Sequence, residues 1–155
     1  MILYRFSHPK FSHDLSGTGA RLKGGRWNPT GIPVLYTSET ISLALLEVLA
    51  NSHTLEELQP LQLMEIHIPD SAEYHEVKLQ SLKKNWYQDF DYTQWLGQEI
   101  LKNKKPLLFQ CPSAIIHKEK NWLVNPLHPD IKKIKLTVAT DFYFDDRLFK
   151  PQPIN

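Results

Sequence analysis

The stretch IPVLYTSETISLALLEVLANS, residues 32–52, decides the fold. Its first seven residues are mostly apolar or β-favouring and predict a strand over residues 32–38. The strand leads into residues 40–52, where Thr40 or Ser38 can serve as the N-cap of a helix. In that helix the apolar side chains recur at helical spacing, at Ile41, Ala44, Leu45, Val48 and Leu49. A strand followed directly by a helix is therefore the predicted centre of the structure.

The other predicted elements do not alternate regularly between strand and helix. We expect strands over residues 2–6, 61–69, 106–111, 113–117, 133–138 and 141–149, and a second helix over residues 92–103. Residues 8–31 hold too many glycines and prolines for a regular element and predict a long structured loop. This pattern favours an α+β fold, and a chain of 155 residues favours one domain over residues 1–155.

Composition narrows the classes of partner. A formal net charge of +1 creates no strong attraction to nucleic acid, so we expect none as a direct partner. No apolar run approaches the length of a membrane span, and residues 1–10 lack the apolar core of a signal peptide, so membrane insertion and secretion are not expected. Cys111 is the only cysteine, which suits a reducing cytoplasm, and the seven histidines show no metal-ligand spacing, so no metal site is expected.

Three features carry candidate chemistry. Glu47 lies beside the apolar stripe of its predicted helix, where a carboxylate either pairs with a basic group at the boundary or points into a cleft. The segment SGTGARLKGGRWNPTG, residues 16–31, holds five of the six glycines with Arg21 and Arg26, which suits an anion but equally a solvated turn. It matches no phosphate-loop or dinucleotide fingerprint. Ser113 lacks a nucleophile elbow and is better interpreted as a hydrogen-bond donor.

Taken together, YRF (residues 4–6), residues 16–49, LGQEIL (96–101), residues 111–130 and FYFDDRLF (142–149) resemble the RES domain family. The family is named for an arginine, a glutamate and a serine, which map onto Arg26, Glu47 and Ser113. The resemblance implies a mixed sheet with flanking helices, related to ADP-ribosyltransferases. It also implies a toxin of a bacterial toxin–antitoxin pair that consumes NAD as substrate without a cofactor, and an Xre-like helix-turn-helix antitoxin that blocks the NAD cleft.

The resemblance also assigns residues. As catalytic residues it implies Glu47 near the scissile bond, Arg26 as the loop arginine and Tyr36 beside the nicotinamide. Trp122 stands where the family often has tyrosine, a departure that leaves these assignments unchanged. Arg5 is implied as a second basic residue on the NAD side, and Asn125 as the asparagine of an Asn-Pro turn. The full set expected to bind the substrate is Arg5, Gly25, Ser38, Ser113 and Asn125.

The expected reaction is consistent with these residue types. Nicotinamide leaves NAD as a neutral molecule, so no acid must protonate it, and a carboxylate such as Glu47 can stabilise the cationic sugar left behind. We expect a NAD glycohydrolase or phosphorylase that depletes NAD and arrests growth. The alternatives are transfer of ADP-ribose to a protein and a non-catalytic module that binds a nucleotide or protein. Exposed aromatics in WYQDFDYTQW, residues 86–95, would suit a homodimer interface.

Overall fold

The computed structural model describes residues 1–149, with only the backbone of Lys104. Its centre is one seven-stranded sheet in the order β4-β5-β6-β2-β1-β3-β7. Neighbouring strands are antiparallel except for the parallel pair β4 and β5, so the sheet is mixed. The strands are β1 (Ile2–Ser7), β2 (Leu35–Ser38), β3 (Gln62–His67), β4 (Tyr74–Glu76), β5 (Leu108–Pro112), β6 (Lys120–Val124) and β7 (Lys135–Asp141).

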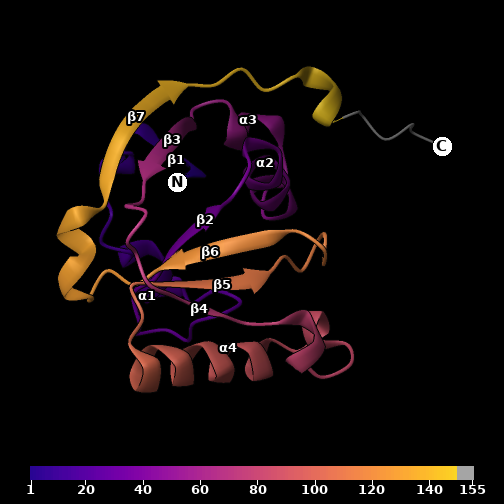
Figure 1. The fold of residues 1–155 in the computed structure, drawn as a ribbon. Coiled ribbons are helices and arrows are strands. Elements are labelled where there is room, and N and C mark those ends of the chain that lie inside the picture. The colour runs from indigo at the N-terminus through magenta and orange to yellow at the C-terminus, as the bar shows by residue number, and fades with distance from the viewer. Residues whose placement is uncertain (150–155) are drawn as a thin grey trace.

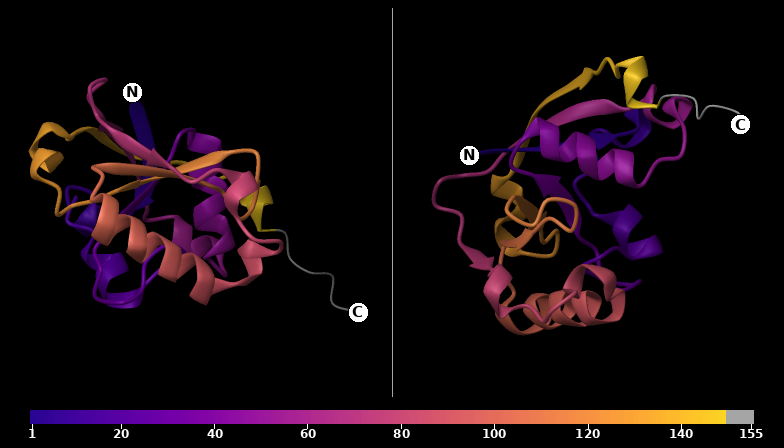
Figure 2. Two further views of the ribbon diagram at one scale, coloured as in Figure 1. Left: turned by 60° about the horizontal axis from the view of Figure 1, so that its bottom comes forward. Right: turned by 90° about the vertical axis from the view of Figure 1, so that its right-hand side faces the viewer.

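Helices flank this sheet, as the α+β prediction requires. They are α1 (Thr18–Lys23), α2 (Ile41–Ala50), α3 (Leu55–Leu58) and α4 (Phe90–Glu99), and α4 runs on into a π-helical turn, Ile100–Lys104. Figure 1 shows α2 and α3 near one end of the sheet and α4 near the other, and the left view of Figure 2 places α2 and α4 on the same side of the strands. Within residues 1–149 we find no helix with the length and hydropathy needed to cross a membrane.

The predicted strand and helix of residues 32–52 are confirmed, and the structure shows which of the two candidate residues is the helix N-cap. The Thr40 hydroxyl accepts a hydrogen bond from the Leu43 N–H at 3.1 Å, so Thr40 and not Ser38 is the N-cap of α2. β2 is shorter than predicted and starts at Leu35. The turn at Glu39 and Thr40 then sends α2 back across the sheet against β1 and β2, which fixes where Glu47 can reach.

Three clusters of buried side chains stabilise the fold. One covers the face of the sheet that holds Leu3, Met64 and Val124. The opposite face, which the helices cover, holds two clusters: one around Trp27, Trp86 and Phe109 near α4, and one around Phe6, Ala44 and Leu58 near α2 and α3. Ser38 of β2 and Asn121 of β6 also lie on this helix-covered face, where Glu47 of α2 contacts Asn121.

The prediction that residues 8–31 form no regular element is wrong. They contain a 3₁₀ turn, Pro9–Phe11, and helix α1. Glycines flank this short helix, because Gly17 (φ 67°) and Gly24 (φ 74°) take positive φ angles that other residues rarely adopt. Beyond α1, Gly25 and Asn28 form an isolated antiparallel bridge that turns the chain toward β2.

Two strand predictions near the C-terminus also fail. Residues 113–117 form a turn, because the Ser113 hydroxyl accepts hydrogen bonds from the Ile115 and Ile116 N–H groups at 3.1 and 3.2 Å. The strand instead follows at β6, which the prediction missed. Of residues 141–149 only Asp141 belongs to a strand, β7, and a 3₁₀ turn, Asp146–Leu148, follows.

Candidate functional site

Glu47 projects from α2 toward the neighbouring strands, where two uncharged groups hold its carboxylate. Its Oε1 accepts a hydrogen bond from the Ser113 hydroxyl at 2.8 Å and another from the Asn121 side-chain amide. Asn121 is fixed in turn, because its Oδ1 accepts a hydrogen bond from the Ser38 hydroxyl at 2.7 Å. The ion pair with a basic group, one of the two interpretations left open by the sequence, is not observed among residues 1–149, and the carboxylate is held by Ser113 and Asn121 instead.

The two oxygens of this carboxylate differ. Oε1 receives both donors, whereas Oε2 accepts no hydrogen bond from any group in residues 1–149. The side chain is half-buried, so Oε2 is held in a defined direction and is still free to accept a hydrogen bond from a bound molecule. The Glu47 carboxylate therefore has a fixed orientation and one oxygen available for a further hydrogen bond.

Ser113 has one proton and two acceptor positions, and all are used. The Ile115 and Ile116 N–H groups occupy its oxygen, so its proton goes to Glu47. The residue is fully buried, and its own N–H donates to the Glu119 carbonyl at 2.9 Å. These contacts are those of the hydrogen-bond donor expected from the sequence, and they couple the 113–117 turn to the carboxylate.

The glycine-rich segment is fastened to β2 through Tyr36. The Tyr36 hydroxyl donates to Asn28 Oδ1 at 2.7 Å and accepts from the Trp27 N–H at 2.9 Å. Burial raises the pKa of Tyr36 above its usual value, so the hydroxyl keeps its proton near neutral pH. The Asn28 amide also donates to the Ile32 carbonyl at 2.8 Å, so the whole turn is held as one unit.

Gly25 lies in this turn because no side chain fits there. A Cβ on Gly25 would lie 2.6 Å from the Tyr36 hydroxyl and 2.9 Å from Asn28 Oδ1, closer than real contacts allow. The Gly25 carbonyl accepts a hydrogen bond from the Gln94 side chain of α4 at 2.8 Å. The glycine therefore lets the turn pack between Tyr36 and α4.

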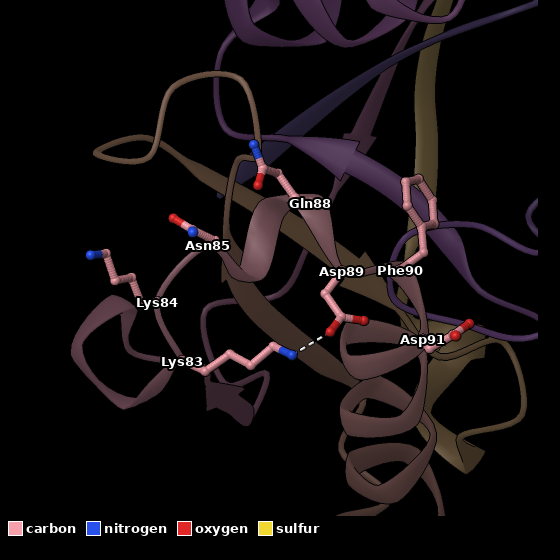
Figure 3. A pocket seen from close by; sticks show the side chains of 7 residues that line it. All are labelled: Lys83, Lys84, Asn85, Gln88, Asp89, Phe90 and Asp91. Atoms are coloured by element: carbon pink, nitrogen blue, oxygen red, sulfur yellow. Dashed lines mark hydrogen bonds and ion pairs between the residues drawn. The ribbon is translucent and has the colours of Figure 1, made fainter.

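Arg26 leaves this turn and rests on the segment before α4. Its Nη1 donates to the Tyr87 carbonyl at 2.8 Å, and its guanidinium lies 4.3 Å from the centre of the Phe90 ring. Burial lowers the pKa of Arg26, and the negative charge of Glu47 is the strongest opposing influence, so the group stays protonated. Phe90 borders an open cavity of about 400 Å³, and Figure 3 shows its ring at the start of α4, pointing away from the ion pair of Lys83 and Asp89.

Two predicted substrate-binding residues lie elsewhere. Tyr4 pairs with Ser38 across the sheet, so the alternation of side chains directs the neighbouring Arg5 to the opposite face. There Arg5 Nε is buried without a hydrogen-bond partner in residues 1–149, and burial lowers the pKa of Arg5 while the charge of Asp14 opposes that change. Asn125 caps a turn by accepting from the Leu127 N–H at 3.0 Å, at the other end of β6 from Asn121, about 13 Å along an extended strand.

Sequence reasoning missed Asn121 and Asn28. Asn121 touches Glu47 only because β6 lies beside β2, and a lone asparagine before Trp122 carries no local signal of that contact. Asn28 is fully buried, and its neighbour Pro29 marks a turn without revealing the side-chain contacts. Within residues 1–149 no group of three or more His, Cys, Asp or Glu side chains is arranged to hold a metal ion.

Comparison with known proteins gives independent evidence for the family to which this chain belongs. The family model described as RES domain matches residues 2–145. A protein named Toxin Res from Pseudomonas putida is 37% identical over 151 residues, covering 96% of this chain and 100% of the relative. A protein named Prs ADP-ribosylating toxin from Sphingobium sp. is 33% identical and covers 88% of each chain. A chain of the M. tuberculosis MbcT–MbcA toxin–antitoxin complex has the same fold, with a TM-score of 0.76 at 22% identity over 91% of this chain and 83% of that one.

Proposed function

The chain belongs to the RES domain family, and from that premise we propose that it is a toxin that cleaves NAD at the nicotinamide–ribose bond. The observation that carries the proposal is the Glu47 carboxylate, held by Ser113 and Asn121 on one oxygen and free on the other. As the bond to nicotinamide lengthens, positive charge develops on the ribose. An anion fixed beforehand stabilises that charge without having to reorient during the reaction.

Each remaining residue then has one task. Oε2 of Glu47 accepts hydrogen bonds from the ribose hydroxyls, and Ser113 and Asn121 keep the carboxylate in that orientation. Arg26 binds the diphosphate with a planar guanidinium that suits phosphate oxygens. The ring of Tyr36 stacks on the nicotinamide while its hydroxyl holds the turn. Arg5 and Asn125 have no step here because Arg5 lies on the opposite face of the sheet and Asn125 lies at the other end of β6 from Asn121.

The biological setting is proposed on the same basis. One neighbour in fold comes from a toxin–antitoxin complex, which supports an antitoxin partner for this chain. We propose an Xre-like antitoxin that covers the Glu47 site, the cytoplasm as the location, and residues 1–155 as one RES domain. NAD is then a substrate, and no cofactor enters the mechanism.

A second function competes for the same site. The Sphingobium relative is named an ADP-ribosylating toxin, so transfer of ADP-ribose to a protein is an alternative fate of the same cationic intermediate. Both reactions begin with release of nicotinamide, and they differ only in the acceptor. Water or phosphate gives NAD hydrolysis or phosphorolysis, whereas a protein side chain gives a modified protein.

The test is nicotinamide release from NAD by the purified protein. We expect turnover that Glu47→Gln abolishes, because the substitution removes the charge and nearly preserves the volume. Glu56→Gln is the matched control, since Glu56 is exposed on α3. NAD that stays intact with the folded parent protein contradicts the proposal.

The acceptor is identified in the same reactions. Free ADP-ribose, ADP-ribose phosphate made only when phosphate is added, and label transferred from NAD to a protein of the cell extract are three distinct products. A parent protein that releases nicotinamide only when extract protein is present favours the transferase over NAD depletion.

A further inference from the structure

A second cavity, of about 410 Å³, lies away from Glu47. Its walls are residues 31–33 before β2, the π-helical turn after α4 and residues 125–129 after β6. Asn125 on this wall and Asn121 beside Glu47 are at opposite ends of β6, so the cavity is separate from the proposed NAD site. Its volume is in the range of small-molecule sites.

The ionisable side chains of this cavity are all basic. Lys102, Lys105 and His128 line it, and no carboxylate does. Neither lysine has an ion-pair partner among residues 1–149, and the nearby Asp130 already pairs with Lys133 at 2.9 Å. His128 Nδ1 accepts the Asp130 N–H at 3.0 Å, so its Nε2 is the nitrogen that carries a proton for a ligand. The cavity therefore attracts an anion.

Its remaining walls are largely apolar and include an exposed rim. Ile32, Pro33 and Leu101 form the inner wall, and Leu127 stands at the edge with 75% of its surface exposed. An apolar side chain this exposed beside a cavity offers contact area to an apolar group.

The backbone at Lys105 is also unusual. Lys105 ends the π-helical turn in a left-handed conformation, φ 47° and ψ 42°, where glycine is the favoured residue. A lysine in this conformation is strained, and strained residues concentrate at binding sites. Three separate features thus meet at one cavity: unpaired cations, an exposed leucine and a strained lysine.

We propose that this cavity binds a small apolar anion, a ring or chain that carries one carboxylate or phosphate. The anionic group contacts Lys102, Lys105 and His128, and the apolar part lies against Leu101 and Leu127. The site adjoins the turn that carries Arg26, because the Asn28 amide binds the carbonyl of Ile32 on the cavity wall. The inference does not depend on NAD cleavage.

The test compares two fluorescent probes on the full chain. 8-Anilinonaphthalene-1-sulfonate is an apolar anion, and N-phenyl-1-naphthylamine is the same ring system without the charge. We expect saturable binding of the sulfonate at one site, about tenfold or more tighter than the uncharged probe, since charge-assisted contacts are the strong ones. Competition by naphthoate and by naphthyl phosphate then separates a carboxylate site from a phosphate site.

Variants localise the binding. Lys102→Gln with Lys105→Gln, and separately Leu127→Ser, should each weaken sulfonate binding about tenfold or more, whereas Lys23→Gln on the exposed side of α1 should not. Lys105→Gly removes one cation of the cavity and relieves the backbone strain. It should therefore weaken sulfonate binding without lowering the urea concentration at which the chain unfolds. Equal affinity for the two probes, an unaffected double variant, or displacement of the sulfonate by NAD each overturns the proposal.

Discussion

Gly97 is the glycine outside the glycine-rich segment, and replacing it with alanine tests how closely α4 packs on that segment. In an exposed helix the change Gly→Ala stabilises by about 1 kcal/mol. Gly97, however, faces the backbone of Trp27: an added Cβ would overlap the Trp27 carbonyl oxygen and lie 2.8 Å from its carbon. Backbone atoms cannot rotate away as a side-chain end can, so α4 or the segment must move.

The structure predicts that the clash outweighs the gain in helix propensity. Overpacking a core costs about 1–3 kcal/mol, and a fixed backbone partner places this site at the upper end. Subtracting the helix gain leaves a net loss of about 2 kcal/mol, which for a chain of this size lowers the melting temperature by about 4–8 °C. Displacement of Trp27 also moves its neighbour Arg26, so NAD turnover should fall.

Urea unfolding of two variants gives the clearest assay. Gly97→Ala should unfold at lower urea, whereas Gly19→Ala should be as stable as the parent or more so, because Gly19 is exposed in α1 and its Cβ would meet no atom within 4 Å. If Gly97→Ala matches the parent in stability, the close packing of α4 on Trp27 is wrong.

Three further predictions concern the site. Ser113→Ala removes one of the two hydrogen-bond donors to Glu47. We expect kcat for nicotinamide release to fall about 10- to 100-fold, because the lost hydrogen bond is to a charged group. An unchanged kcat in folded protein would exclude the orienting role of Ser113. Phe90→Leu removes the ring that contacts the Arg26 guanidinium, so Arg26 loses a cation–π contact. KM for NAD should then rise about 2- to 30-fold in steady-state kinetics. A change in kcat alone would contradict diphosphate binding by Arg26. Tyr36→Phe loses two hydrogen bonds and should be less stable than the parent by about 1–3 kcal/mol at pH 8. Because burial raises the folded pKa of Tyr36 above its unfolded value of 10.0, the stabilising effect is complete below pH 10 and is lost as the pH rises further, so urea midpoints measured from pH 8 to 11 should converge.

The centre of the fold could be predicted because its signals are local. The strand and helix of residues 32–52 follow from side-chain periodicity and a threonine cap, and both are present. Residues 113–117 show why periodicity is insufficient. Their isoleucines favour a strand, but the buried Ser113 hydroxyl binds the N–H groups that a strand would have used.

The candidate site could be predicted only in part, because several of its contacts depend on strand pairing between residues far apart in the sequence. Glu47 stands out in the sequence because a carboxylate beside an apolar stripe is unusual. Its partner Asn121 is 74 positions away and becomes a neighbour only through the pairing of β2 with β6. The position of Arg5 likewise depends on sheet register, since a shift of one residue exchanges the faces.

The order of the elements along the chain has a consequence for synthesis. Ser38 and Glu47 belong to the first third of the chain, whereas Ser113 and Asn121 come from its last third. A ribosome adding about 5–20 residues per second needs roughly 4–15 s to pass from Glu47 to Asn121. Until then a nascent chain holds its Glu47 carboxylate without the Ser113 and Asn121 groups that orient it, so the complete candidate site can form only late in synthesis.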